Sequence, residues 1–191
     1  MANKKKSYNL DDLVDTYNID NIYEQYKRFE FLDKLNNYIN LKKSTVLELG
    51  SATGQMTAIL SKKAKKVTAV DGSAKFIKIA KLRVKNKKNV GFFKSYFEDF
   101  KIEIKYDCLV MHHILEHIKD PVYLLSKIQE FLNDNGILAI SVPNACALSR
   151  QLAVKMNILP SVYALSPNDK KHGHYRIYDW KTLEEELKKV I

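Results

Sequence analysis

A short apolar run that ends in a glycine loop constrains the fold of this chain more than any other feature. Residues 46–49 are apolar apart from Glu48, and Gly50 and Gly54 follow them four positions apart. Residues 56–60 can then start a helix. A strand, a tight turn and a helix in this order form the place where an open α/β sheet holds a nucleotide-like ligand. Glycine suits such a loop because it tolerates positive φ and lets a ligand approach the backbone.

The loop does not match the G-x-G-x-x-G pattern of dinucleotide-binding sheets. Ala52 and Gln55 occupy the positions of the second and third glycines. A NAD-dependent enzyme is therefore a weaker alternative. An ordinary strand-to-helix turn with no ligand is a second alternative for the loop taken alone.

A second acid strengthens the ligand-site interpretation. Residues 67–70 form an apolar strand-like run, and Asp71 follows it, 21 residues beyond Gly50. A carboxylate at the end of the second strand, about 20 residues after the loop, is where a ribose diol is bound. A helix cap at Asp71 or Ser73 is the alternative reading of the same residues. The two acids Glu48 and Asp71 would point at one crevice.

Strands and helices alternate through the middle of the chain. We expect strands at 45–50, 66–70, 90–93, 106–112 and 137–142, and helices at 55–63, at 73–85 and from Pro121 to a turn at 133–136. This alternation, with apolar strand runs, predicts an α/β fold with a doubly wound, mostly parallel sheet covered on both faces. Ligands bind such sheets at the carboxyl ends of the strands.

The two ends of the chain differ from this pattern. We expect residues 1–40 to form a helical lead-in whose first nine residues are disordered. Within it, Asn18 or Asp20 would cap a second helix. Residues 41–191 form the ligand-binding domain. Within it, 145–157 is a candidate helix, and 145–178 is a candidate substrate lid. A last helix through Lys189 is capped by Asp179 or by Thr182, and Thr182 with Glu185 fits a capping box.

Composition limits the function classes. The 191 residues fit one domain, and hydrophobic and charged fractions of 46% and 28% are those of a soluble protein. No apolar run approaches the ~20 residues of a membrane span, and no apolar segment follows the basic residues 1–6 as a secretory signal requires. Cys108 and Cys146 lie in apolar contexts, which predicts buried free thiols in the cytoplasm. The net charge of +10 comes mostly from scattered lysines, so we do not expect a nucleic-acid partner.

With these residues considered together, the chain resembles the class I S-adenosylmethionine-dependent methyltransferases. It is most similar to their small-molecule branch, which includes quinone-biosynthesis and sugar O-methyltransferases. Four stretches carry the resemblance: Glu48-x-Gly50-x-x-x-Gly54, Asp71, residues 106–121 with Leu-Glu-His and Asp-Pro, and residues 136–144. The tail at 172–189 is similar to a tail segment of the same branch. The resemblance implies a Rossmann-like methyltransferase fold, S-adenosylmethionine as cofactor, and methyl transfer to an oxygen, less readily a nitrogen or carbon, of a small-molecule acceptor.

The resemblance also implies a set of cofactor-binding residues along the strand ends. The set is Glu48, Gly50, Ser51, Ala52, Gly54, Asp71, Gly72, Ser73, Phe97, Glu98, Met111 and His112. The glycine loop would pass under the methionine part, with Glu48 orienting its amino group. Asp71 would bind the ribose hydroxyls, and Phe97 and Glu98 would edge the adenine. Residues 111–113 would lie near the reactive methyl.

One part of the family fold has no counterpart here. The family sheet ends with an antiparallel pair, the sixth and seventh strands, for which 191 residues leave no room. We therefore expect either a fragment, incomplete at its C-terminus, or a sheet edge closed in another way. An uncovered edge strand invites association, so a homo-oligomer through that edge is a further expectation.

Histidines supply the candidate bases. Positioning an acceptor against an activated methyl can be worth ~7–11 kcal/mol, and a base must then remove the acceptor proton. His suits this near neutral pH. The candidates are His112, His113, His172 and His174. We rank His113 first, because it follows the fourth strand, and retain His174 as a second catalytic candidate. A packed or solvated imidazole is the alternative for each.

His113-x-x-Glu116-His117 also matches the H-x-x-E-H pattern of a class of zinc peptidases. That pattern belongs inside a long helix, whereas here it follows an apolar strand. In quinone-biosynthesis O-methyltransferases, acids and a His in this block are linked to a divalent metal, and here the first of them is His rather than Glu. We expect a structural pair of Glu116 and His117, and no metal. The net charge leaves an RNA-modifying methyltransferase or a non-catalytic RNA binder as the alternative function.

Overall fold

The computed structural model describes residues 10–11, 14 and 22–190. The strands are β1 (Thr45–Leu49), β2 (Lys66–Asp71), β3 (Val90–Lys94), β4 (Tyr106–His112) and β5 (Leu132–Ser141). The helices are α1 (Ile22–Leu35), α2 (Gln55–Lys63), α3 (Ala74–Arg83), α4 (Pro121–Gln129), α5 (Leu148–Lys155), α6 (Pro167–Lys171) and α7 (Trp180–Leu187). Short 3-10 turns, η2 (Leu41–Lys43) and η3 (Leu115–His117), join them.

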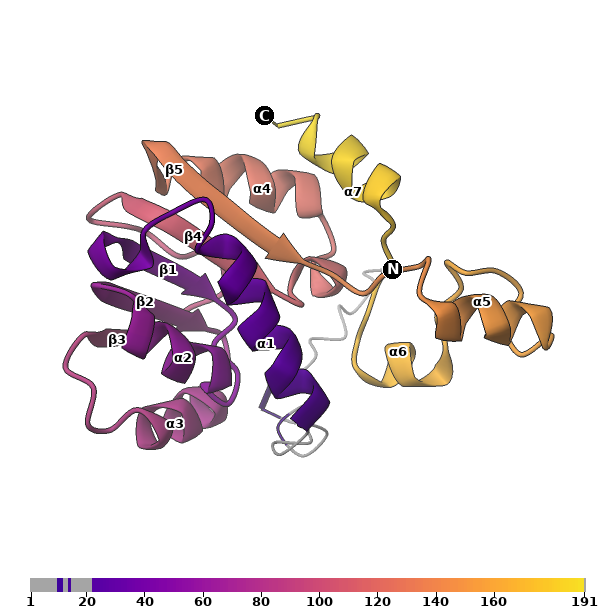
Figure 1. The fold of residues 1–191 in the computed structure, drawn as a ribbon, viewed down its shortest axis with the longest axis horizontal. Coiled ribbons are helices and arrows are strands. Elements are labelled where there is room, and N and C mark those ends of the chain that lie inside the picture. The colour runs from indigo at the N-terminus through magenta and orange to yellow at the C-terminus, as the bar shows by residue number, and fades with distance from the viewer. Residues whose placement is uncertain (1–9, 12–13, 15–21, 191) are drawn as a thin grey trace, which may run out of the picture.

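The five described strands form one parallel sheet in the order β3-β2-β1-β4-β5 (Figure 1). This confirms the predicted α/β class and the predicted order of elements. Leu49, the last residue of β1, pairs with Val70 on one side and Met111 on the other. The loop after β1, Asp71 and His112 therefore leave the sheet side by side at one edge.

Both faces of the sheet are covered, as the apolar strand runs predict. Successive residues of a strand point to opposite faces. Val46 belongs to a core with Leu32 of α1 and Leu60 of α2, whereas Leu47 belongs to a second core with Leu124 of α4 and Leu183 of α7. The central strands β1 and β4 are buried on both sides, which fixes their register and the position of their carboxyl ends.

β5 starts five residues earlier than predicted. The sequence placed a turn at residues 133–136, but these residues lie within the strand. Tyr106 pairs with Leu132 and Cys108 pairs with Ile137, so the polar segment bulges opposite Asp107. The Asn133 side chain donates a hydrogen bond to Asp107 Oδ1 at 2.8 Å, and this contact links the bulged segment to β4.

Two further expectations were wrong. Cys146 is exposed rather than buried, whereas Cys108 is buried as predicted. The capping box of α7 joins Asp179 to Thr182, not Thr182 to Glu185, because Asp179 accepts the Thr182 N–H and Thr182 Oγ1 accepts the Asp179 N–H. Residues 1–9 and the proposed caps Asn18 and Asp20 lie outside the described residues.

The chain leaves the sheet after β5 and returns before α7. Figure 1 shows α5 and α6 projecting beyond the carboxyl end of β5. The N–H of Ala145 donates to the Tyr178 carbonyl at 2.6 Å, so a hydrogen bond joins the two ends of this segment.

Among the described residues, no helix has the length and apolar character needed to cross a membrane.

Candidate active site

A cavity of about 810 Å³ opens over the carboxyl ends of the strands. Its volume lies in the range of small-molecule sites. Ten of the residues predicted from the sequence line it: Gly50, Ser51, Ala52, Asp71, Gly72, Phe97, Glu98, His112, His113 and His174. Four others, Glu48, Gly54, Ser73 and Met111, lie behind the lining.

Asp71 ties together two of the loops that line the cavity. Its Oδ2 accepts the Ala52 N–H at 2.8 Å, and its Oδ1 accepts the Ser73 N–H at 2.9 Å. Burial raises the pKa of this carboxyl group, and these two N–H groups act in the opposite direction. Each carboxylate oxygen keeps a second acceptor position, so Asp71 can also bind hydroxyl groups of a ligand.

The two loop glycines have different tasks. Gly50 has φ +85° and lines the cavity, and a Cβ on it would lie 2.0 Å from Ile114 Cδ1. Gly54 has φ +78°, caps α2 and lies against α3, where its Cβ would be 2.7 Å from Ala80 Cα. Gly50 therefore keeps the site open, and Gly54 lets two helices pack. Ala52 between them takes φ +42° without being glycine.

The acid of β1 is buried behind the loop. Thr57 Oγ1 donates a 2.7 Å hydrogen bond to Glu48 Oε2, and Glu48 Oε1 has no hydrogen-bond partner among the described residues. Burial raises the pKa of Glu48 to about 8. Ser73 caps α3 by accepting the Phe76 N–H, and Met111 is fully buried in the core.

Two adjacent histidines end β4 inside the cavity. His113 has φ +55°, a conformation that costs a non-glycine residue energy and that clusters at functional sites. Its Nδ1 lies 3.0 Å from Glu116 Oε1. His112 Nδ1 is 2.6 Å from Ser141 Oγ, and burial lowers the His112 pKa to about 2. His112 is therefore neutral and fixed, while His113 faces the cavity with a carboxylate partner.

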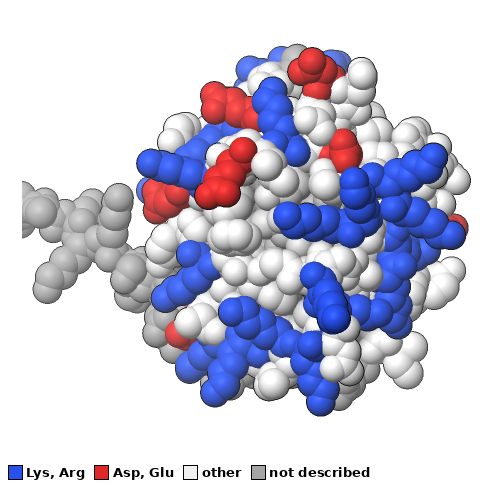
Figure 2. All heavy atoms as spheres, turned by 90° about the vertical axis from the view of Figure 1, so that its left-hand side faces the viewer, with Lys and Arg blue, Asp and Glu red and all other residues white. Residues whose placement is uncertain are grey.

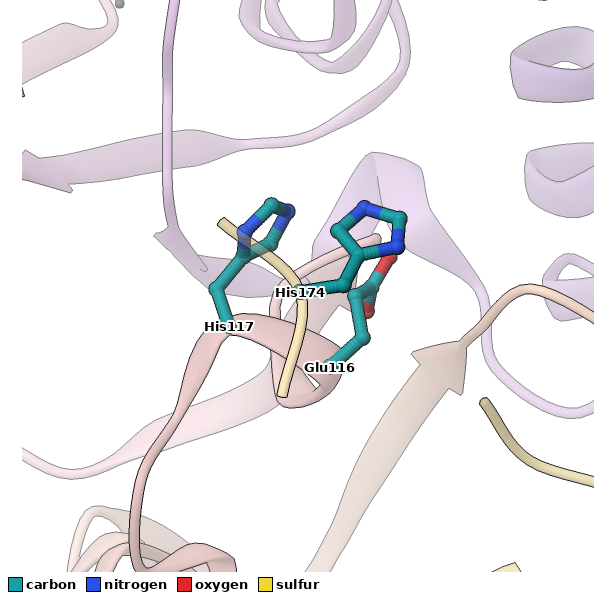
Figure 3. Close-up of side chains that lie close together, drawn as sticks. All are labelled: Glu116, His117 and His174. Atoms are coloured by element: carbon teal, nitrogen blue, oxygen red, sulfur yellow. The ribbon is translucent and has the colours of Figure 1, made fainter. Parts of the chain in front are cut away.

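Glu116, His117 and the tail residue His174 line the cavity, and their side chains lie close together (Figure 3). We expected Glu116 to pair with His117, but its hydrogen-bond partner in the structure is His113. Glu116 and His117 lie on the short turn η3 rather than in a long helix, which removes the structural context of a zinc peptidase. Burial lowers the pKa of both His117 and His174.

The cavity also contains residues that the sequence interpretation did not assign to it. Lys27 and Arg28 reach it from α1, Tyr96 from the loop after β3, and Lys171 from the end of α6, next to the base candidate His172, which also lines the cavity. The position of α1 over the sheet results from tertiary packing, and no local sequence pattern predicts it. α6 did have a signal, since residues 166–169 form a capping box with proline at its first turn.

Several buried polar atoms in the lining lack a hydrogen-bond partner. Within the described part of the chain these include Ser51 Oγ, His112 Nε2 and Glu116 Oε2. Buried polar groups in folded proteins are nearly always paired, so a group left unpaired needs an explanation. Three such atoms on residues that line one cavity indicate a site shaped for a polar ligand.

A parallel sheet in this strand order, with a glycine loop and an acid at the ends of β1 and β2, defines a nucleotide-type ligand site on a Rossmann-like fold. The comparison with known families assigns the chain further. It belongs to the methyltransferase domain family, whose pattern matches residues 22–190.

Curated relatives and solved structures agree with this assignment. Ubiquinone biosynthesis O-methyltransferase of Xylella fastidiosa is 27% identical over 126 residues, which cover 64% of this chain and 51% of that protein. The enzyme of the same name from Pelagibacter ubique is 27% identical over 115 residues, covering 60% and 48%. The chain thus spans about half the length of these curated relatives.

Two solved structures share the fold. The N-methyltransferase NodS of Bradyrhizobium japonicum, in complex with S-adenosyl-L-homocysteine, has a TM-score of 0.69 at 16% identity, covering 94% of this chain and 85% of that one. DhpI, also in complex with S-adenosylhomocysteine, has a TM-score of 0.66 at 22% identity, covering 94% and 82%.

Proposed function

We propose that this protein transfers a methyl group from S-adenosylmethionine to an oxygen of a small-molecule acceptor. The observation that carries the proposal is the carboxylate of Asp71, fixed by two backbone N–H groups at the rim of the 810 Å³ cavity beside the Gly50 loop. Family membership and the names of the O-methyltransferase relatives support it.

Each side of the cavity has a proposed task. Asp71 binds the ribose hydroxyls, and residues 50–52 lie along the methionine part. Phe97 and Glu98, in the loop after β3, edge the adenine. Glu48 acts from behind the loop: its unpartnered Oε1 can accept a hydrogen bond from the cofactor's amino group if the loop shifts.

The cofactor supplies an activated methyl on its sulfonium, so the protein has to hold the acceptor, exclude water and remove one proton. We assign the proton removal to His113. Glu116 accepts from Nδ1 of this imidazole and so leaves Nε2 as the basic nitrogen. The pairing also fixes the ring orientation, as carboxylates do for catalytic histidines. His174, which also lines the cavity, is the second candidate.

Residues 145–178 are proposed as the acceptor lid of a cofactor-binding domain that covers 41–191, with 1–40 as a helical lead-in. The lid contributes Asn168, Lys171, His172 and His174 to the cavity. It is held as a unit by Arg150, whose Nε donates to the Val162 carbonyl at 2.7 Å and whose Nη1 lies 3.1 Å from Asp169 Oδ2.

We also propose that two copies associate through the free edge of β5. Among the described strands β5 pairs only with β4, and residues 136–141 carry no charge that would protect the edge. Amide exchange in this segment should slow as protein concentration rises and a dimer mass emerges in light scattering. Exchange that is independent of concentration in a monomeric sample would exclude this association.

The two free cysteines favour a cytoplasmic location.

A second candidate function rests on surface charge. Figure 2 shows Lys and Arg side chains spread across one face of the molecule, with most of the acidic side chains in its upper part. This face favours an RNA-modifying methyltransferase or an RNA-binding protein. Either predicts affinity for RNA that falls steeply with salt, whereas the small-molecule enzyme predicts none above background.

The proposal is tested by titrating the protein with S-adenosylhomocysteine and, separately, with NAD. We expect saturable binding of the first and none of the second. Release of labelled methyl onto members of an acceptor panel that carry hydroxyl groups should follow. Binding of NAD, or of neither compound, would contradict the proposal.

A further inference from the structure

We propose that the methyl acceptor is an anionic small molecule, a hydroxyl compound that also carries a carboxylate or phosphate group, and that Lys171 binds this group. The inference rests on the proposed methyl transfer and names the acceptor class for it. In that reaction the acceptor's hydroxyl oxygen bonds to the methyl carbon, the carbon–sulfur bond breaks with its electron pair left on sulfur, and His113 takes the hydroxyl proton. Lys171 holds the acceptor by its anionic group during this step.

The acids that line the cavity are committed to other tasks. Asp71 and Glu98 follow β2 and β3, where the ribose and the adenine are proposed to bind. The Glu24 carboxylate of α1 lies 2.5 Å from Lys27 Nζ. Glu116 is buried and engaged by the imidazole of the proposed base. In the described part of the chain, none of these acids forms an ion pair with a lysine or arginine of the lid.

Lys171 is a lining cation whose side chain is unpaired. It is the last residue of α6, and its side chain forms neither an ion pair nor a hydrogen bond with the residues that the structure describes. The nearest acid of the lid, Asp169, is already engaged by Arg150 Nη1 at 3.1 Å and by Ser166 Oγ at 2.7 Å. Lysine carries three donors and a full charge on a flexible stem, so its ammonium group can reach an anion in the cavity.

The helix α6 directs its residues unequally toward the cavity. Asn168 and Lys171, three positions apart, both line it, as does His172, the C-cap residue that follows the helix. Positions three and four apart share one side of a helix. His172 Nδ1 donates a 2.8 Å hydrogen bond to the Asn168 carbonyl, which holds this imidazole at the end of the helix. Lys170 is exposed in the same turn but does not line the cavity, so it is an internal reference for an ordinary surface lysine.

Two cations of α1 add to the positive field at the end of β4. Lys27 and Arg28 line the cavity. Burial is the main reason that the His112 pKa is low, and the charges of Arg28 and Lys27 lower this pKa further. Their field therefore reaches the strand end beside which the acceptor hydroxyl is proposed to lie. A field of this sign attracts an anionic acceptor and disfavours a cationic one.

The aromatic rings of the lining lie on the cofactor side. Phe76 belongs to α3, and Tyr96 and Phe97 belong to the loop after β3. Toward β4, β5 and the lid, the described lining has no Phe, Tyr or Trp and consists of histidines, polar residues of α6 and a few aliphatic residues. Small-molecule sites orient their ligands through a few polar groups. On this side, charge and hydrogen bonds therefore contribute more to recognition than aromatic stacking does.

The test uses labelled S-adenosylmethionine, the full chain and hydroxyl compounds matched in skeleton. One set is glycolate, hydroxyethyl phosphate, glycolamide and ethanolamine, and the other is hydroxybenzoate, hydroxyphenyl phosphate, hydroxybenzamide and hydroxybenzylamine. We expect kcat/KM for a carboxylate or phosphate to exceed that for its amide at least ~10-fold, because a hydrogen bond to a charged group is worth about 10–100-fold. Lys171→Ala should remove this preference by lowering kcat/KM for the anion alone, and Lys171→Arg should keep it.

Lys170→Ala is the matched control and should behave as the wild type does. Both lysines are exposed, so both variants should keep the wild-type melting temperature. The anionic group whose kcat/KM falls more in Lys171→Ala, carboxylate or phosphate, identifies the group that is bound.

If no compound is methylated, calorimetric binding of the same compounds to the protein saturated with S-adenosylhomocysteine decides by the same criteria. Equal values for acid and amide, equal losses in the two alanine variants, or binding of none of the compounds would overturn the inference. A protein that binds no S-adenosylhomocysteine contradicts the proposed function instead. A protein that binds it and prefers the amide or the amine contradicts the anionic acceptor alone.

Discussion

Gly54→Ala tests how the glycine loop is built. Gly54 has φ +78°, and an added Cβ would lie 2.7 Å from Ala80 Cα and 2.8 Å from Ala80 Cβ. The Ala80 backbone cannot move aside easily, since Arg83 Nε donates to the Thr53 carbonyl at 2.9 Å and ties α3 to the loop. Left-handed φ costs an alanine about 1–2 kcal/mol, and overpacking costs about 1–3 kcal/mol more. We expect a total destabilisation of about 2–5 kcal/mol.

Gly173→Ala is the matched control for this prediction. Gly173 has nearly the same φ, +77°, but a Cβ there would meet nothing within 4 Å. It should therefore lose only the conformational part, about 1–2 kcal/mol. Thermal unfolding measures both variants, at roughly 2–4 °C per kcal/mol for a chain of this size. Equal losses of melting temperature in the two variants would refute the claim that Gly54 is required for packing.

Three further predictions concern the acid, base and thiol groups. His113→Ala should slow methyl transfer by roughly 10²–10⁴-fold if His113 is the base; a rate equal to that of the wild type would remove His113 as the base. Burial in the folded protein raises the Glu48 pKa from 4.5 to about 8, so the folded protein binds this proton more tightly than the unfolded chain does. The free energy of unfolding should therefore fall as pH rises from about 4.5 to about 8. At 1.4 kcal/mol per pH unit the loss amounts to up to roughly 5 kcal/mol. Glu48→Gln should flatten that pH dependence in denaturant titrations, and an unchanged slope would show that Glu48 ionises normally. A thiol reagent should label one site per native chain, the exposed Cys146, because burial raises the Cys108 pKa to about 12; labelling of two thiols before unfolding would contradict the buried position of Cys108.

The sequence predicted the fold well where local pattern and tertiary position coincide. β4 and α2 have the predicted bounds, because an apolar run and a helix between clear breaks leave little choice. The fifth strand was less predictable: its polar residues 133–136 have the composition of a turn, and only pairing with Asp107 shows that they bulge within a strand.

The site was predictable at the strand ends and not beyond them. In a parallel sheet, residues that follow strands converge, so Gly50, Asp71 and His113 could be placed together from the sequence. Lys27 of α1 could not, because the angle at which a helix crosses a sheet depends on packing along its whole length. The approach of His174 to Glu116 is a contact across 58 positions that no local pattern records.

The affinity of S-adenosylhomocysteine for the wild type and for Asp71→Asn, measured by calorimetry, tests the proposed cofactor site most directly. Asp107→Asn is the control, since Asp107 lies near the start of β4, at the opposite end of that strand from the cavity. Two hydrogen bonds from ribose hydroxyls to a carboxylate are worth about 1.5–3 kcal/mol each. We predict at least a ~10-fold loss of affinity in Asp71→Asn and wild-type affinity in Asp107→Asn. Unchanged affinity in a folded Asp71→Asn variant would contradict the assignment of the cofactor to this cavity.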